Sequence, residues 1–186
     1  MTIPGQPDPA GQVIWKDQCR ETLIIKYPAG VAPFIYTGAF NSSSATVVRG
    51  AAPDFVGDWI ADGGAASGEH WNNPVWATDV FLHVGALSCS AVGPLTEAKS
   101  FDLHSCVAAP GDSGGPVYHY NPDGTVTARG TITDGDFGSA PCPGIAPTGS
   151  NLVLYAPLLR PAGDPQTGVL QYYGTYVWPN ITIATG

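Results

Sequence analysis

Short apolar runs of β type recur along the chain between clusters of glycine, proline, asparagine and aspartate. Runs of this length that alternate or are rich in β-branched and aromatic residues predict strands rather than helices. We expect strands over residues 22–27, 33–38, 45–51, 80–87, 115–120, 125–132, 151–158 and 175–184. Their number and spacing predict an all-β barrel or sandwich.

The clearest local signal is a hairpin that joins residues 115–120 to residues 125–132. The sequence "NPDG" at residues 121–124 combines proline, which presets φ, with glycine, which accepts a positive φ. Two stretches rich in proline and glycine, residues 1–13 and 137–149, are predicted to be loops.

Composition and charge narrow the class of protein. A chain of 186 residues can bury a core without metals, and 24 glycines, 18 prolines and only 12% charged residues favour an all-β protein. The net charge of −8 disfavours nucleic acid and anionic membranes as partners. No run of 18 apolar residues is present, and the start "MTIPGQPDPAGQ" does not resemble a secretory signal peptide.

The segment "CVAAPGDSGGP", residues 106–116, contains the candidate chemistry. A serine hydroxyl is a weak nucleophile, so the surrounding backbone must assist acyl transfer. Glycine at positions 111, 114 and 115 lets the chain turn tightly and aim the N–H groups of Gly111 and Ser113 at one point, where a tetrahedral oxyanion would form. The alternative is a glycine-rich turn with an incidental serine.

This segment resembles the nucleophile segment of the chymotrypsin-like serine proteases. The "AAP" that closely follows Cys106 is similar to the secreted bacterial branch typified by the streptogrisins and alpha-lytic protease. Residues 35–68, which end in "VGDWIADGGAASG", are similar to the entry of the second barrel in that branch. The resemblance covers residues from about 21 to 160.

The resemblance implies a fold and a division of the chain. The fold is an antiparallel β-barrel, the second barrel of the double-barrel chymotrypsin fold, together with the last strand or strands of the first. Residues 1–45 would be a remnant of the first barrel and the connection between barrels, residues 46–162 the second barrel with the nucleophile loop, and residues 163–186 a C-terminal strand or tail.

Roles in the nucleophile loop follow from the same resemblance. Ser113 would be the nucleophile, and the N–H groups of Gly111 and Ser113 would form the oxyanion hole. Asp112, Gly114 and Gly115 would support the loop.

Substrate would pair its backbone with Thr133, Asp134 and Gly135 as an added strand. The carboxylates of Asp134 and Asp136 either favour a basic substrate side chain or are solvated loop residues.

Two departures from the family pattern affect the loop's surroundings. Ala61 stands where the pattern has a cysteine whose partner would fall near Trp71, so both members of one disulfide are missing. Asp62 stands where some bacterial members have an arginine. Because a buried Asp112 would need a partner, we expect Arg49 or a water network to satisfy it.

The four cysteines at positions 19, 89, 106 and 142 allow three pairings. The resemblance implies a disulfide between Cys106 and Cys142 beside the specificity pocket, which leaves Cys19 and Cys89 as a pair by elimination. A zinc site formed by Cys89, His104 and Cys106 is the alternative. His104 and Cys106 are too close for ordinary ligand spacing, and a fourth ligand has no obvious candidate. We expect no cofactor or metal.

The catalytic histidine of the family has no counterpart in this sequence. It lies in the first barrel, in a motif similar to Thr-Ala-Gly-His-Cys, ahead of the carboxylate. His83 and His119 fall in expected strands, His70 and His104 in expected loops, and all four follow the carboxylate position. A different hydrolase that uses His70 or His104 remains an alternative, since triads occur in several chain orders.

The orienting carboxylate also departs from the pattern. The family's Asp-x-Ala-Leu-Ile corresponds to "ETLII", which places Glu21 where aspartate is expected. One more methylene moves the carboxylate oxygen unless the backbone compensates. Asp17 is the second candidate.

Two functional hypotheses follow. The first is a secreted serine endopeptidase domain that acts through Ser113 in an N-terminally incomplete chain; the second is an inactive pseudoprotease that binds peptides or serves as a structural module. Both imply a peptide or protein partner. The apolar stretch at residues 22–38 favours the first, because it is suited to neighbouring strands. The chain as given should hydrolyse peptides poorly, because it lacks a base.

Overall fold

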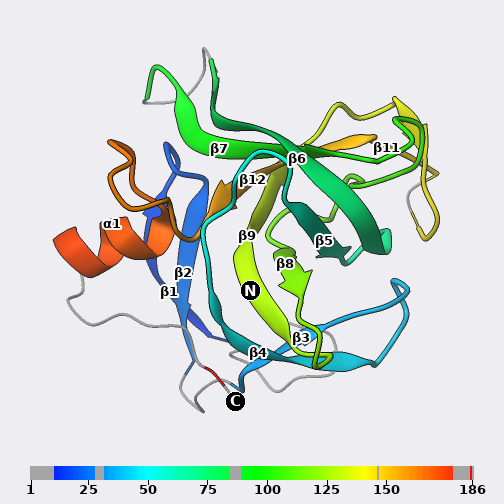
Figure 1. Ribbon diagram of the computed structural model, residues 1–186, viewed down its shortest axis with the longest axis horizontal. Coiled ribbons are helices and arrows are strands. Elements are labelled where there is room, and N and C mark those ends of the chain that lie inside the picture. Colours follow the sequence, from blue (N-terminus) through cyan, green and yellow to red (C-terminus); the bar gives the residue numbers. More distant parts are fainter. Residues whose placement is uncertain (1–10, 28–31, 84–88, 146, 178–184, 186) are drawn as a thin grey trace.

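The computed structural model describes residues 11–27, 32–83, 89–145, 147–177 and 185 (Figure 1). The elements in these ranges are β1 (Gln12–Asp17), β2 (Thr22–Lys26), β3 (Phe34–Tyr36), β4 (Ala45–Ala51), β5 (Trp59–Gly64), β6 (Gly68–Leu82), β7 (Val92–Lys99), β8 (Pro116–Tyr120), β9 (Val126–Asp134), β10 (Ala140–Pro141), β11 (Thr148–Gly149), β12 (Leu152–Pro157) and α1 (Val169–Tyr176). The expected all-β class is confirmed.

The main sheet closes into a barrel because β12 pairs with two strands. Its neighbours run in the order β12-β7-β6-β5-β8-β9, and β12 also pairs with β9, where Tyr155 faces Ile132. These barrel pairings are antiparallel. On the outside, β4 pairs in parallel with β9, and β3, beyond β4, is the last strand of the sheet within the described residues.

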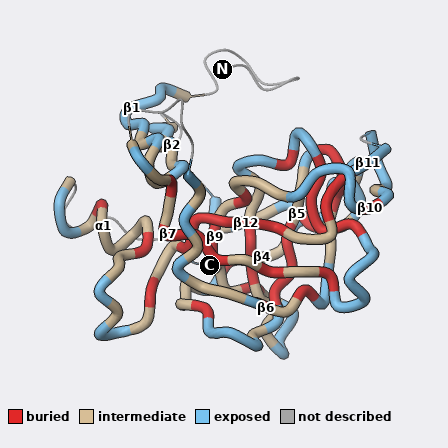
Figure 2. The backbone as a smooth tube through the Cα atoms, turned by 90° about the horizontal axis from the view of Figure 1, so that it is seen from above, coloured by how far each residue is buried: buried red, intermediate tan, exposed pale blue. Residues whose placement is uncertain are grey.

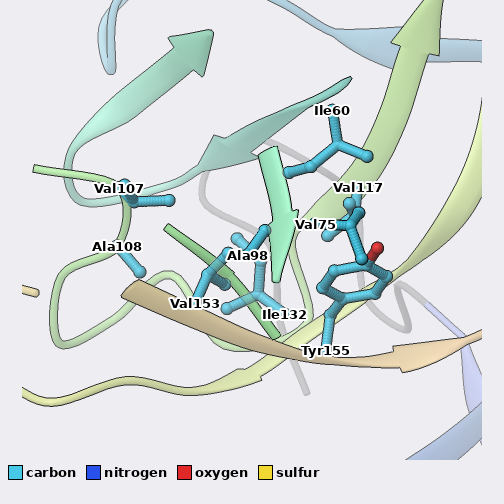
Figure 3. Packing of buried hydrophobic residues seen from close by; sticks show 9 residues of the cluster. All are labelled: Ile60, Val75, Ala98, Val107, Ala108, Val117, Ile132, Val153 and Tyr155. Atoms are coloured by element: carbon cyan, nitrogen blue, oxygen red, sulfur yellow. The ribbon is translucent and has the colours of Figure 1, made fainter. Parts of the chain in front are cut away.

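Small and β-branched side chains fill the barrel interior (Figure 3). The central cluster consists of Ile60, Val75, Ala98, Val107, Ala108, Val117, Ile132, Val153 and Tyr155. Tyr155 is the largest member, and its hydroxyl donates to Asp54 Oδ2 at 2.7 Å, so the polar end of this side chain is satisfied. Burial of this apolar surface is the main term that holds the barrel together.

The predicted hairpin is present as β8 and β9. Its turn lies at residues 121–124, where Gly124 has φ +80° and the Asn121 N–H donates to the Thr125 carbonyl at 2.8 Å. The turn aligns Val117 with Gly130 and Tyr120 with Val126 across the hairpin. The two strands then carry the nucleophile loop and the expected substrate-binding segment to the same end of the barrel.

Sequence patterns missed β1, β5, β7, most of β6, and the short strands β10 and β11 inside the loop predicted over residues 137–149. In β6, Asn72 and Asp79 have left-handed φ values of +59° and lie in a strand whose register shifts several times. Turn-forming residues therefore mark bulges within this strand rather than its ends. Residues 84–87, the rest of the strand expected over 80–87, lie outside the described residues.

The expected strand over residues 175–184 is wrong at its start, because Thr175 and Tyr176 belong to α1. The Gln171 side chain accepts the N–H groups of Arg160 and Gly168, both at 2.8 Å, and so satisfies donors at the helix start. Residues 178–184 lie outside the described ranges. In those ranges, α1 is the one helix, and it is too short to span a bilayer.

The hairpin of β1 and β2 stands beside α1, apart from the barrel (Figures 1 and 2). A disulfide joins Cys19, in its turn, to Cys89, and the Cys19 carbonyl accepts the Gly93 N–H at 2.9 Å. The Arg20 guanidinium lies 3.8 Å above the ring of Tyr172 in α1. The boundaries proposed after residues 45 and 162 remain predictions.

Candidate active site

The nucleophile loop is fastened across one end of the barrel. The disulfide between Cys106 and Cys142 is present, with Cα atoms 5.0 Å apart, as the resemblance implied. An isolated antiparallel β-bridge joins Ala108 to Ser150, and the Ser150 N–H donates to the Ala108 carbonyl at 2.7 Å. Because Cys89 and Cys106 are both in disulfides, neither supplies a thiolate for the alternative zinc site.

The backbone turns sharply on both sides of Ser113. Gly111 has φ +104° and Gly114 has φ +86°, conformations that favour glycine. The Asp112 N–H donates to Ala109 and the Gly114 N–H donates to Ile132, at 3.0 and 2.8 Å. The turn leaves Ser113 exposed beside the buried Asp112.

Two N–H groups of the turn have no acceptor within the described residues, those of Gly111 and Ser113. The N–H groups of Asp112, Gly114 and Gly115, by contrast, all donate to backbone carbonyls. Unpaired donors that flank a nucleophile can receive a developing oxyanion. The assignment of Gly111 and Ser113 to an oxyanion hole is unchanged as a prediction.

Asp112 is satisfied without a cation. Its Oδ1 accepts the N–H groups of Ala66 and Ser67 at 2.7 and 3.1 Å, and its Oδ2 accepts the Ala109 N–H at 2.7 Å and the Ser67 hydroxyl at 2.5 Å. The expectation that Arg49 or a water network satisfies Asp112 is therefore wrong. Arg49 instead lies exposed on β4, near Asp123. The N–H and O–H donors close to Asp112 fill the role that was expected of Arg49.

Asp62 lies behind this loop as a second, fully buried carboxyl group. Asn73 donates to its Oδ2 at 3.4 Å, and its Oδ1 has no partner among the described residues. Burial raises the pKa of Asp62 well above its usual range, and the charges of Asp112 and Glu69 raise it further. This position therefore favours the protonated form of Asp62, at a site where the resemblance places an arginine in some bacterial proteases.

Ala61 and Trp71, where the family pattern would place a disulfide, lie on paired strands opposite each other. Ile60 pairs with Asn73 and Asp62 pairs with His70, so Ala61 lies opposite a bulge that contains Trp71. Ala61 packs in a cluster with Val48, Tyr118 and Val126, and the Trp71 ring contacts Tyr120 with centroids 5.8 Å apart. Packed side chains therefore occupy this region in place of a covalent link.

The Ser113 hydroxyl donates to the Thr133 carbonyl at 3.4 Å. Thr133, Asp134 and Gly135 follow one another at the end of β9, and Gly135 packs against Ser150. The nucleophile therefore lies next to the segment expected to bind substrate. Backbone pairing between this segment and a substrate remains a prediction.

None of the four histidines, all within the described ranges, hydrogen-bonds to Ser113. His70 lies in β6, not in the expected loop, and its Nε2 is 2.8 Å from Ser67 Oγ. His83 directly follows β6 and contacts the Ser90 carbonyl through Nδ1 at 3.2 Å. His119 on β8 contacts the Trp59 carbonyl at 2.8 Å, and His104 is exposed in a loop.

The two candidate carboxylates lie in the hairpin of β1 and β2. Glu21 has a left-handed φ of +48° in its turn; burial raises its pKa, and so does the charge of Asp134. Glu21 therefore lies near the expected substrate segment, although no described histidine bonds to it. Asp17 accepts the N–H groups of Cys19 and Arg20, which fix the turn.

A groove of about 930 Å³ runs past Ser113. Its lining includes Phe34, Tyr36 and Phe40 from the connection around β3, and Gly64, Ser113 and Thr131 from the barrel. Sequence reasoning did not predict this groove, because β3 reaches the loop only through the parallel pairing of β4 with β9.

Similar solved structures share this arrangement of strands. Thermobifida fusca Protease A matches with a TM-score of 0.57 over 88% of this chain and 67% of its own. A glutamic acid specific serine protease matches with a TM-score of 0.53 over 87% and 66%, and Cellulomonas bogoriensis chymotrypsin with 0.56 over 88% and 69%. Each is 20% identical to this chain.

The chain has the chymotrypsin fold. It spans about two thirds of the length of these proteases. By sequence, no family model and no curated protein matches the chain. The fold therefore agrees with the resemblance seen in residues 106–116, while activity has to be argued from the site.

One feature of this chymotrypsin fold was invisible in the sequence, the contact of Ser67 and His70 with the nucleophile loop. Ser67 and Asp112 are 45 residues apart and meet only because β5 and β6 form a hairpin beside the loop. The spacing of Ser67 and His70 carries no signal of its own.

Proposed function

We propose that this chain is a serine-type endopeptidase domain in which Ser113 attacks the carbonyl carbon of a peptide bond. The Ser113 Oγ would form a bond to that carbon, and its proton would pass to a base. The carbonyl oxygen becomes an oxyanion that accepts the N–H groups of Gly111 and Ser113. Collapse of this intermediate releases the amine, which takes up the proton, and leaves an acyl group on Ser113.

The observation that carries the proposal is the turn at Ser113. It combines an exposed hydroxyl, two N–H groups without acceptors in the described structure, and a buried Asp112 that holds the turn in place. The adjacent groove, with its apolar lining and with β3 as the outermost strand of the described sheet, suits an extended peptide. Together with the chymotrypsin fold, these features favour acyl transfer over an incidental glycine-rich turn.

The general base is the part that the described residues lack. We propose that a histidine from residues beyond this sequence supplies it, with Glu21 as the orienting carboxylate. The position of Glu21 near Asp134 supports this assignment. The two disulfides agree with an oxidising, extracellular location.

Added imidazole offers a direct test, because it can accept the Ser113 proton in place of the missing histidine. We expect imidazole to accelerate p-nitrophenolate release from p-nitrophenyl acetate in the wild-type chain beyond its effect on Ser113→Ala. Ser113→Ala keeps the backbone N–H groups of the turn and loses only the hydroxyl, so the excess rate in the wild type measures acyl transfer to Ser113. Equal rates in the two proteins would rule out the proposal.

A second function is favoured by the bond from the Ser113 hydroxyl to the Thr133 carbonyl. In an inactive peptide-binding module, the serine would only brace the substrate-binding segment. Such a module would bind extended peptides with equal affinity in the wild type and in Ser113→Ala, and imidazole would have no serine-dependent effect. Isothermal titration with an unmodified peptide library separates this function from the first.

A further inference from the structure

The hydroxyl of Ser67 has a defined orientation. Its oxygen lies 2.5 Å from Asp112 Oδ2 and 2.8 Å from His70 Nε2. A serine has one hydroxyl proton, and an ionised carboxylate can only accept, so that proton lies on the Asp112 side. The His70 contact must then be a hydrogen bond from Nε2–H to Ser67 Oγ, which fixes the tautomer of the imidazole.

The surroundings of His70 favour a neutral ring that keeps this proton. Burial lowers the pKa of His70, while the charges of Asp112 and Glu69 oppose the shift. Asp62, opposite His70 on β5, has a pKa raised well above its usual range by burial, and the Cys106 sulfur at 3.9 Å is uncharged in its disulfide. Even if the ring gains a proton in acid, Nε2–H remains a donor to Ser67.

We infer that His70 is a positioning residue for the nucleophile loop. Its Nε2–H holds the Ser67 hydroxyl turned toward Asp112, and the Asp112 carboxylate, bonded to Ala66, Ser67 and Ala109, anchors the turn that carries the N–H groups of Gly111 and Ser113. The kinetic consequence rests on the proposed function of Ser113, whereas the hydrogen-bonded chain does not. In this role His70 transfers no proton to or from substrate.

Among the groups that donate to Asp112, the Ser67 hydroxyl is the one that can rotate away from it. The other three donors are backbone N–H groups of residues fixed by neighbouring strands and turns, but a hydroxyl can rotate. Without a donor at His70, the Ser67 hydroxyl is free to turn away from Asp112. A lost donor matters here, because Asp112 is 1% exposed and has no access to bulk water.

Substitutions at His70 separate the hydrogen bond from the volume of the ring. His70→Gln places an amide N–H2 near the position of Nε2, whereas His70→Phe keeps the ring and removes the donor. Ser67→Ala removes the middle link with a small change of volume, so it serves if His70→Phe fails to fold. His83→Phe is the matched control, because His83 is exposed and its hydrogen bond within the described residues goes to the Ser90 carbonyl.

Nuclear magnetic resonance tests the chain of hydrogen bonds without any activity. We expect the ¹⁵N signals of His70 to show a protonated Nε2 and a bare Nδ1 at pH 7. The amide signals of Gly111 and Ser113 should shift in His70→Phe and Ser67→Ala, and stay near wild type in His70→Gln and His83→Phe. A protonated Nδ1, or equal shifts in the Gln and Phe variants, would overturn the inference.

Acylation kinetics tests the consequence for the nucleophile. With imidazole present, we expect His70→Phe and Ser67→Ala to lower the serine-dependent rate about tenfold or more, and His70→Gln to restore most of it. If the wild type shows no serine-dependent rate, the proposed function fails and the amide signals alone decide the inference. If the wild type is active and His70→Phe equals it, the inference fails and the proposed function stands.

Discussion

The barrel and the hairpin of β1 and β2 are both made of short antiparallel strands, yet they bury their side chains very differently (Figure 2). In the barrel, Ile132 is 4% exposed and Val117 is fully buried. In the hairpin, Ile25 is 40% exposed and Val13 is 48% exposed. The difference shows that β-type sequence alone does not create a core. In this chain the core forms where the sheet closes on itself.

The same contrast separates the two halves of the candidate site. The turn at Ser113 is held by the closed barrel, because the Asp112 carboxylate accepts hydrogen bonds from Ala66, Ser67 and Ala109. Glu21 lies in the turn of the open hairpin, which is attached through one disulfide and a few contacts with α1. The nucleophile is thus well supported and the candidate orienting acid is not.

The largest effect is expected from matched isoleucine truncations. Ile132→Ala should lower the free energy of unfolding by about 2–5 kcal/mol, because it leaves a cavity in the closed core. Ile25→Ala should change it by less than about 0.5 kcal/mol, because that side chain is already in contact with water. Urea denaturation measures both, and equal losses would show that the hairpin is part of the cooperative core.

The disulfides give a sharper test, because chain entropy and burial predict opposite orders. Cys19 and Cys89 are 70 residues apart and Cys106 and Cys142 are 36 apart, so loop closure alone favours the first pair. We expect the reverse in paired alanine variants, because the apolar side chains of the hairpin are exposed and those of the barrel are buried. Loss of the Cys106–Cys142 disulfide should cost about 2–4 kcal/mol and loss of the other less than about 1 kcal/mol.

The order of the two midpoints in thermal denaturation decides between these views. A lower midpoint for the Cys19→Ala, Cys89→Ala variant would mean that the hairpin is as firmly attached as the loop.

A third prediction concerns the buried acid of the barrel. The pKa of Asp62 in the folded protein lies well above its ordinary value of 3.8, so the folded state holds a proton that the unfolded chain releases. This contribution to stability is complete below about pH 4 and is lost as the pH rises toward the folded pKa, by up to about 1.4 kcal/mol per pH unit.

Asp62→Asn stays neutral and should remove this slope. Unfolding free energies measured from pH 4 upward test it, with the exposed Asp136→Asn as the control of equal charge change. An unchanged slope in Asp62→Asn would show that Asp62 does not hold its proton in the folded state.

The smallest effect on stability is expected from polar substitution in the hairpin. Leu23→Ser should change the free energy of unfolding by less than about 0.5 kcal/mol, because Leu23 is 47% exposed. Because the hairpin presents apolar side chains to water, we expect the chain to self-associate through it and Leu23→Ser to weaken that association. Sedimentation at increasing concentration measures this, and unaltered association would place the contact surface elsewhere.

The sequence predicted those parts of the fold that are determined by residues close together in the chain. The "NPDG" turn and the alternating residues around it gave β8, β9 and the place of Ser113. The strand β6 was mostly missed because Asn72 and Asp79 are turn formers that the sheet accommodates as bulges. The C-terminal residues near Tyr176 have β-type composition, but contacts with the β1 and β2 hairpin and the Gln171 cap favour a helix there.

The candidate site divides in the same way. The "GDSGGP" sequence was enough to predict the tight turn around Ser113, because its conformation depends on the glycines at positions 111 and 114. The partners of Asp112 could not be predicted, because Ala66 and Ser67 approach it from a hairpin more than 40 residues away. The nearest basic residue in the sequence pointed to Arg49 as the partner of Asp112. The donors in the structure are backbone N–H groups and the Ser67 hydroxyl.

The central claim is that Ser113 sits in a working acyl-transfer turn and lacks only a base. The most direct measurement is peptide-mapping mass spectrometry of the chain after incubation with p-nitrophenyl acetate and imidazole at low temperature. We expect an acetyl group on the peptide that contains Ser113, dependent on imidazole and absent from Ser113→Ala. Acetylation spread over lysines and other serines, with none enriched at Ser113, would contradict the account.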